Sequence, residues 1–79
     1  KTLHLIRNNE GFYFMTANDF KNVYVFSVQK NAFSLQNKIL VKETGLLNPA
    51  FNQRSSFIEL IDDGKTYKLN SEGIEEGVK

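Results

Sequence analysis

The stretch SSFIELIDDGKTYKLN, residues 55–70, decides the fold because it is compatible with two structures. In one, two strands fold over an Asp63-Gly64 turn, and Asp-Gly between apolar runs is a strong signal for a tight hairpin. In the other, a helix that begins near Pro49 ends at Gly64 as its left-handed cap, and a single strand follows. The first structure belongs to a small β domain and the second to a mixed domain of helices and strands.

A neighbouring stretch, FSLQNKILV at 33–41, favours the hairpin. Its apolar residues alternate with polar ones, so Phe33, Leu35, Ile39 and Val41 share one face and Asn37 is the exception. A period of two over nine residues is typical of a strand, whereas a helix would scatter these side chains around its circumference. In 66–69 the same alternation directs Tyr67 and Leu69 towards the core.

Two further hairpins are predicted upstream. KTLHLIR (1–7) and GFYFMT (11–16) flank the turn residues NNEG (8–11), and VYVFSVQ (23–29) precedes the alternating stretch 33–42. The sequence therefore predicts a mainly β domain of five or six strands, built as successive hairpins into a small barrel or a folded sheet. At most one short helix is expected, near 49–54, where Asn48 before Pro49 resembles a helix start.

Length and composition predict one small domain, 1–79, with 71–79 as a polar tail. The hydrophobic content of 41% and the charged content of 24% are those of a globular chain rather than a disordered one. Seven Phe and three Tyr supply much of the expected core. The chain begins with Lys1 rather than methionine, as a piece excised from a longer protein would. No apolar run approaches the ~20 residues that span a bilayer, and no signal peptide is visible.

The sequence offers few groups for catalysis or for metal and cofactor binding. It has no cysteine, and its one histidine, His4, lies in an apolar strand segment. The adjacent carboxylates Asp62 and Asp63 are expected to be solvated turn formers, and DDGKTYKLNSE lacks the ligand spacing of a calcium loop. We therefore expect no cofactor, no metal site and no enzymatic activity.

The helical alternative carries a function of its own. The segment 34–73 superficially resembles a winged-helix DNA-binding domain, in which Asn48 to Asp63 would form the recognition helix. The resemblance implies nucleic-acid contacts from six residues of the helix and wing: Asn52, Gln53, Arg54, Ser56, Lys65 and Lys68. Glu59, Asp62 and Asp63 depart from that pattern, because they would make a poor surface for DNA.

A second nucleic-acid alternative rests on GFYFMTANDF (11–20), which resembles the aromatic strand of RNA-recognition motifs. The resemblance implies that Phe12 and Phe14 stack on bases, in this case from a small β-barrel. Core packing of both rings is the favoured interpretation. The strand–helix–strand order of that family does not fit, because only ten residues precede Gly11.

Charge decides between the function classes. Ten basic and nine acidic side chains give a net charge of +1, whereas dedicated binders of the phosphate backbone carry a clear basic excess. The favoured function is a non-enzymatic interaction module that binds another protein within a larger protein or assembly. Its expected contact residues form an apolar segment with one anchoring arginine: Leu46, Leu47, Phe51 and Arg54.

Overall fold

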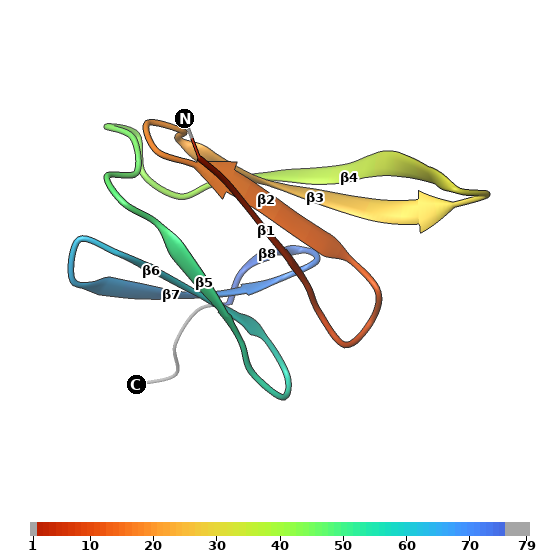
Figure 1. The fold of residues 1–79 in the computed structure, drawn as a ribbon. Coiled ribbons are helices and arrows are strands. Elements are labelled where there is room, and N and C mark those ends of the chain that lie inside the picture. The colour runs from red at the N-terminus through yellow and green to blue at the C-terminus, as the bar shows by residue number, and fades with distance from the viewer. Residues whose placement is uncertain (1, 76–79) are drawn as a thin grey trace.

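The computed structural model describes residues 2–75 and consists of two four-stranded antiparallel sheets (Figure 1). Sheet A contains, in order, β1 (Leu3–Arg7), β2 (Tyr13–Ala17), β3 (Asn22–Gln29) and β4 (Ala32–Leu40). Sheet B contains, in order, β5 (Ala50–Gln53), β6 (Ile58–Asp62), β7 (Lys65–Asn70) and β8 (Gly73–Ile74). The mainly β fold of successive hairpins is confirmed, with eight strands where five or six were expected and with no helix among residues 2–75.

The Asp63-Gly64 hairpin is confirmed. Asp63 and Gly64 have φ angles of 50° and 78°, the two positive values that a type I′ turn between β6 and β7 requires. Lys30 and Asn31 make an equivalent turn between β3 and β4, with φ angles of 54° and 66°. Both turns match the right-handed twist of the strands that they join, which fixes the register of each hairpin.

The helix expected near 49–54 is wrong, and so is the winged-helix alternative. Residues 50–53 form β5, which pairs antiparallel with β6, and residues 48–63 contain two strands and turns instead of a recognition helix. The physical reason is packing. A helix of about six residues is unstable alone, whereas the strand pairs Phe51 with Leu60 and lays the Phe51 ring against the core.

The hydrophobic core lies between the two sheets. Its fully or almost fully buried members come from both sheets and from the segment that connects them: Phe14, Val23, Val25, Ile39, Leu46, Ile58, Leu60 and Leu69. Tyr67 packs against the edge of this cluster, so the expected inward orientation of Tyr67 and Leu69 is confirmed.

Side-chain amides join the edges of the two sheets. β1 lies beside β5, where Gln53 Nε2 donates a hydrogen bond of 2.9 Å to the Arg7 carbonyl oxygen. β4 lies beside β8, where Asn37 Nδ2 donates one of 3.3 Å to the Ser71 carbonyl. Within the expected polar tail, 71–79, the structure describes residues up to 75, and Gly73–Ile74 form β8.

The segment that links the sheets, residues 41–49, is held by the buried carboxylate of Asp62. Asp62 Oδ1 accepts hydrogen bonds from the backbone N–H groups of Leu47 at 2.9 Å and Asn48 at 2.7 Å. Asp62 Oδ2 lies 3.3 Å from Lys42 Nζ. The carboxylate thus replaces the backbone partners that a strand or helix would have offered this irregular segment.

The connecting segment is also bound to sheet A. The Leu46 N–H donates to the Phe20 carbonyl at 2.8 Å, and the Asp19 N–H donates to the Leu46 carbonyl at 2.7 Å. Gly45 allows this approach: its φ is +95°, and a Cβ there would lie 3.3 Å from the Asp19 carbonyl oxygen. The segment therefore carries Leu46 into the core between the sheets.

Asp62 corrects the expectation that both aspartates are solvated turn formers. Asp62 is 1% exposed, while the Asp63 side chain is 62% exposed. Burial raises the pKa of Asp62, but the hydrogen bonds from Asn48 and Leu47 and the charge of Lys42 outweigh it. The pKa of Asp62 consequently lies below the ordinary aspartate value.

We expect Asp62→Asn to lower the free energy of unfolding by about 2–4 kcal/mol, because it removes an acceptor and the charge that neutralises Lys42. Urea unfolding monitored by circular dichroism measures the loss. Asp63→Asn is the matched control and should change stability by less than ~0.5 kcal/mol, since asparagine also tolerates the positive φ of this turn. Equal losses in the two variants would contradict the assigned role of Asp62.

The lowered pKa of Asp62 also predicts a dependence on pH. The unfolded state holds a proton on this carboxyl group where the folded state does not, so stability rises with pH across that window. The contribution is complete above the ordinary value of about 4 and is lost as the pH falls through the lower folded-state pKa. Acid titrations of wild type and Asp62→Asn should therefore converge below about pH 4, and parallel curves would contradict this origin.

Candidate interaction surface

The outer face of sheet A, the side turned away from sheet B, is built mainly of apolar side chains. Strand pairing places residues on it in alternation with the buried positions Phe14 and Val25. From β1 to β4 the outer face comprises Leu3, Leu5, Arg7, Tyr13, Met15, Ala17, Asn22, Tyr24, Phe26, Val28, Phe33, Leu35, Lys38 and Leu40. Only two of these side chains carry a fixed charge.

A β-bulge in β4 brings two of the largest side chains to this face. Val25 pairs with Asn37 and Phe26 with Leu35, so Gln36 is an extra residue without a partner of its own. The bulge shifts the alternation by one position, and Leu35 and Asn37 point to opposite faces. The predicted shared face of Phe33, Leu35 and Ile39 is therefore wrong: Ile39 is 6% exposed in the core, whereas Phe33 and Leu35 are 59% and 57% exposed.

The outer face of sheet A holds most of the exposed apolar surface. Of the seven large apolar side chains that are exposed within residues 2–75, six lie on this face, namely Leu3, Leu5, Val28, Phe33, Leu35 and Leu40. The outer face of sheet B is its opposite, because Asn52, Glu59, Thr66 and Lys68 occupy it with Ile61 and Ala50. The two outer faces thus differ in polarity, and the outer face of sheet A is the one with a large exposed apolar surface.

Aromatic contacts order part of the outer face. The Phe33 ring packs against Tyr13, with ring centroids 5.2 Å apart in an edge-on arrangement, and against Phe26 at 5.8 Å. Towards the other end of the sheet, Phe20 meets Tyr24 edge-on at 6.0 Å. These are favourable geometries for aromatic pairs. The rings already hold each other in place, so little side-chain entropy remains to be lost on binding.

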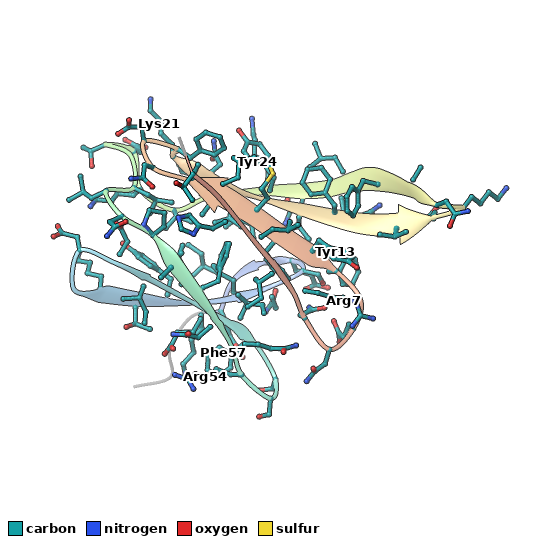
Figure 2. The ribbon with its side chains drawn as sticks, in the orientation of Figure 1. Arg7, Tyr13, Lys21, Tyr24, Arg54 and Phe57 are labelled. Carbon is teal, nitrogen blue, oxygen red and sulfur yellow. The ribbon has the colours of Figure 1, made fainter. Side chains whose placement is uncertain are left out.

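The charges on the outer face are positive. The four described strands of sheet A contain no Asp or Glu, and their fixed charges are Arg7 on β1 and Lys38 on β4, the two edge strands. Figure 2 shows Arg7 and Tyr13 beside the β1–β2 loop and Tyr24 farther along the sheet, towards Lys21. The centre of the face is apolar, and its cations stand at the rim.

The four residues expected to contact a partner are dispersed in the structure. Leu46 is fully buried in the core, and Phe51 is half-buried against it. Leu47 is 57% exposed, and the Arg54 side chain, 52% exposed, pairs with Glu59 at 2.7 Å. The hydrogen bond from Arg54 lowers the pKa of Glu59. Leu47 and Arg54 flank β5 at opposite ends, so these four residues do not form one exposed patch.

The residues of the winged-helix alternative lie on strands and turns of sheet B. Asn52 and Arg54 both donate to Glu59, and Gln53 bonds to the β1 backbone. The Lys68 ammonium group lies 5.2 Å from the centre of the Phe57 ring. Ser56 is in the turn between β5 and β6, and Lys65 opens β7. No shared helix presents this set to a groove of DNA.

Of the two rings proposed to stack on bases, Phe14 is not available for stacking and Phe12 is partly buried. Phe14 has no exposed surface, and Phe12 packs against the core. The favoured interpretation, that Phe12 and Phe14 pack in the core, is confirmed: Phe14 belongs to the core cluster and Phe12 packs against it. The rings that sheet A exposes are those of the opposite parity, Tyr13 and Phe26 together with Phe33.

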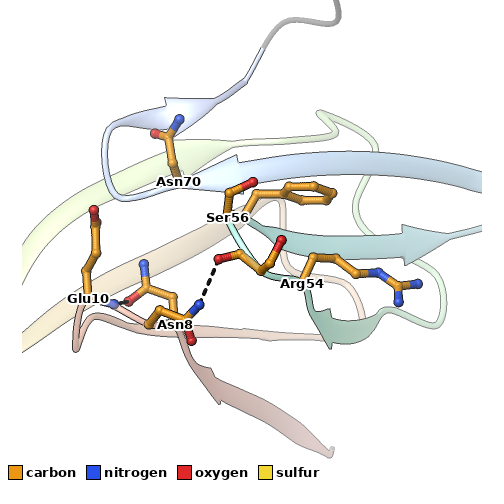
Figure 3. A pocket seen from close by; sticks show the side chains of 8 residues that line it. Asn8, Glu10, Arg54, Ser56 and Asn70 are labelled. Atoms are coloured by element: carbon orange, nitrogen blue, oxygen red, sulfur yellow. Dashed lines mark hydrogen bonds between the residues drawn. The ribbon is translucent and has the colours of Figure 1, made fainter.

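A polar cavity of about 320 Å³ lies between the β1–β2 and β5–β6 loops (Figure 3). The polar groups of its asparagines hold the fold together. Asn8 Oδ1 accepts from the N–H groups of Glu10 and Phe12, and Asn9 Nδ2 donates to the Ser55 carbonyl at 2.7 Å. Asn70 Oδ1 accepts from two N–H groups of the turn that follows it. We interpret the cavity as the seam between two loops.

Comparisons with known proteins provide no name for the fold or the surface: no family model matches the chain, and no curated protein or solved structure matches it significantly. Within residues 2–75, no three His, Asp or Glu side chains gather in a way that could hold a metal ion. The described residues form no helix long and apolar enough to cross a membrane. The case for function thus rests on the outer face of sheet A.

The outer face could have been suspected from the sequence. FYFM at 12–15 and VYVF at 23–26 are continuous apolar runs, which are typical of strands covered on both faces. Phe33 and Leu35 gave no such signal, because the bulge that turns them outward is invisible in the alternation of 33–41.

Leu46 and Leu47 are adjacent in the sequence, but the first is buried in the core and the second is exposed, so substituting each tests this assignment. We expect Leu46→Ala to lower the free energy of unfolding by about 2–5 kcal/mol, because it leaves a cavity between the sheets. Leu47→Ala, its matched control, should cost less than ~0.5 kcal/mol. Urea denaturation of both variants measures the difference, and similar losses would contradict the burial of Leu46.

Proposed function

We propose that this chain is a non-enzymatic protein-binding module whose contact surface is the outer face of sheet A. One observation carries the proposal: the part of sheet A that packs on sheet B is apolar on both faces, with Phe14, Val23, Val25 and Ile39 on the inner one. An antiparallel sheet with one solvated face alternates apolar and polar side chains, as sheet B does. A sheet with apolar side chains on both faces is typical of one that is covered twice, and sheet B covers only the inner face of sheet A.

The size of the apolar area supports the proposal. The six exposed apolar side chains present roughly 600 Å², at about 100 Å² for each, which is the upper end of the largest patch on a typical monomer. The patch is extended by the partly exposed side chains of Tyr13, Met15, Tyr24 and Phe26. The total approaches the ~800 Å² per partner that a standard protein interface buries.

The composition of the face favours a protein over a nucleic acid. Proteins that bind single strands combine aromatic rings with a basic groove that follows the phosphates. Here leucine and valine predominate among the exposed side chains, and Arg7 and Lys38 are the fixed charges on the face. Protein interfaces instead have an apolar and aromatic centre with arginine at anchoring positions, which matches the outer face of sheet A.

The non-enzymatic part of the proposal rests on the sequence. The chain has no cysteine and a single histidine, His4, whose β1 position lies opposite Thr16. The sequence therefore offers no cysteine nucleophile, and it offers one histidine as a base for covalent catalysis. Binding is therefore the activity that the surface supports best.

Selection from a displayed library of random peptides tests this function. We expect the wild-type chain to enrich peptides that bind it, because the ordered apolar face offers a ready surface. The variant Leu5→Lys/Leu35→Lys, with two charges on that face, should bind the enriched peptides at least tenfold more weakly. Fluorescence anisotropy with the synthetic peptides measures the affinities.

Thr66→Lys is the matched control, since it adds a lysine to the outer face of sheet B. It should bind the enriched peptides as the wild type does. Unfolding in urea establishes that all variants are folded before binding is compared. If the chain is monomeric under the conditions of selection, failure to enrich any peptide would contradict the proposed surface. Equal losses in the two lysine variants would contradict it in any case.

A further inference from the structure

We infer that the outer face of sheet A binds a second copy of the same chain, forming a two-fold symmetric dimer. The inference rests on the proposed function and names the partner for that surface. Two-fold dimers are the commonest protein assemblies, and each uses the same patch on both subunits. The question is therefore whether this patch is complementary to itself in area, shape and charge.

The area is sufficient. Two outer faces that each lose roughly 600–800 Å² would bury about 1,200–1,600 Å² in total, the range of specific and stable interfaces. Most of that area is aliphatic or aromatic, which resembles the interfaces of homodimers. The aromatic cluster of Tyr13, Phe26 and Phe33 supplies the large rings that act as anchors in such interfaces.

The shape is also suitable. The face belongs to a four-stranded antiparallel sheet, and two sheets of equal twist pack face to face at ~10 Å with their strands about 30° apart. The hairpin of β3 and β4 extends beyond β1 and β2 (Figure 1), so Val28 and Phe33 lie near its free tip. A partner must cover this projecting tip as well as the centre of the sheet.

One orientation of the dyad covers the tip. With the axis in the plane between the sheets and perpendicular to the strands, β4 of one copy lies over β4 of the other in the opposite direction. Phe33 at the tip then meets Leu40 at the far end of β4 in the second copy. Tyr24 meets Phe26 close to the axis. A dyad parallel to the strands would leave both tips uncovered.

The charges do not favour this dimer, since the cations of both copies meet at the same rims, but exposure to water screens their repulsion. Arg7 and Lys38 belong to the edge strands, so both fall at the rim of the paired faces. Their aliphatic stems can cover Leu5 and Leu35 of the second copy while the charged groups reach water. Because the four described strands of sheet A contain no acidic residue, the interface buries no carboxylate without a partner.

Sedimentation velocity over a concentration series tests the dimer. The wild-type chain should sediment as a dimer with a micromolar or tighter Kd. Leu35→Lys should raise that Kd at least ~100-fold, because it replaces an apolar contact by a second cation beside Lys38 of the other copy. Thr66→Lys should leave it unchanged. Far-ultraviolet circular dichroism confirms that each variant is folded.

Cross-linking tests the orientation of the dyad independently. Because the chain has no native cysteine, only the introduced cysteines can react. A short bismaleimide should join Phe33→Cys to Leu40→Cys efficiently in an equimolar mixture of the two variants. Either variant alone should give little product. Efficient cross-linking of each variant with itself would overturn this dyad.

A wild-type chain that stays monomeric up to millimolar concentration would overturn the dimer. If peptides selected on the wild type then still require Leu5 and Leu35, a heterologous segment occupies the face and the proposed function stands. If no peptide is enriched and no dimer forms, both the dimer and the proposed function fail. The two experiments thus separate the identity of the partner from the existence of the surface.

Discussion

The buried carboxylate of Asp62 is the constraint on which the two-sheet structure depends. It lies at the end of β6, yet its hydrogen bonds go to the segment 41–49 that leaves sheet A. One acceptor group therefore fixes the path of the chain between the sheets and places Leu46 in the core. Without this acceptor the backbone N–H groups of Leu47 and Asn48 would lose their partner within the protein.

Once the sheets are fixed, the difference between their outer faces is the feature on which the proposed function rests. Sheet B exposes amide, hydroxyl and charged groups, whereas sheet A exposes leucine, valine and phenylalanine. The bulge at Gln36 contributes by turning Phe33 and Leu35 away from the core. The extra residue Gln36 thus extends the apolar outer face of sheet A along the projecting hairpin of β3 and β4 (Figure 1).

The fold was largely predictable, whereas the outward orientation of Phe33 and Leu35 was not. Asp63-Gly64 and the alternation of 33–41 identified hairpins because turn chemistry and a period of two are local properties. The helix expected near Pro49 failed because β6 offers the short segment 50–53 a better partner than its own backbone. Leu46 and Phe51 were expected in an exposed apolar loop, whereas packing between the sheets buries Leu46 fully and Phe51 partly.

The expected core rich in aromatic rings was wrong, because the buried cluster within residues 2–75 is aliphatic except for Phe14. The sequence by itself determined the β strands and the hairpins that join them. Those features follow from the conformational preferences of each residue and its nearest neighbours. Tertiary structure alone decided which aspartate is buried, which face of each strand is covered, and where the alternation of β4 breaks. Each of these depends on contacts between residues distant in the chain, such as Asp62 with Leu47 or Tyr13 with Phe33. Local preference cannot encode them.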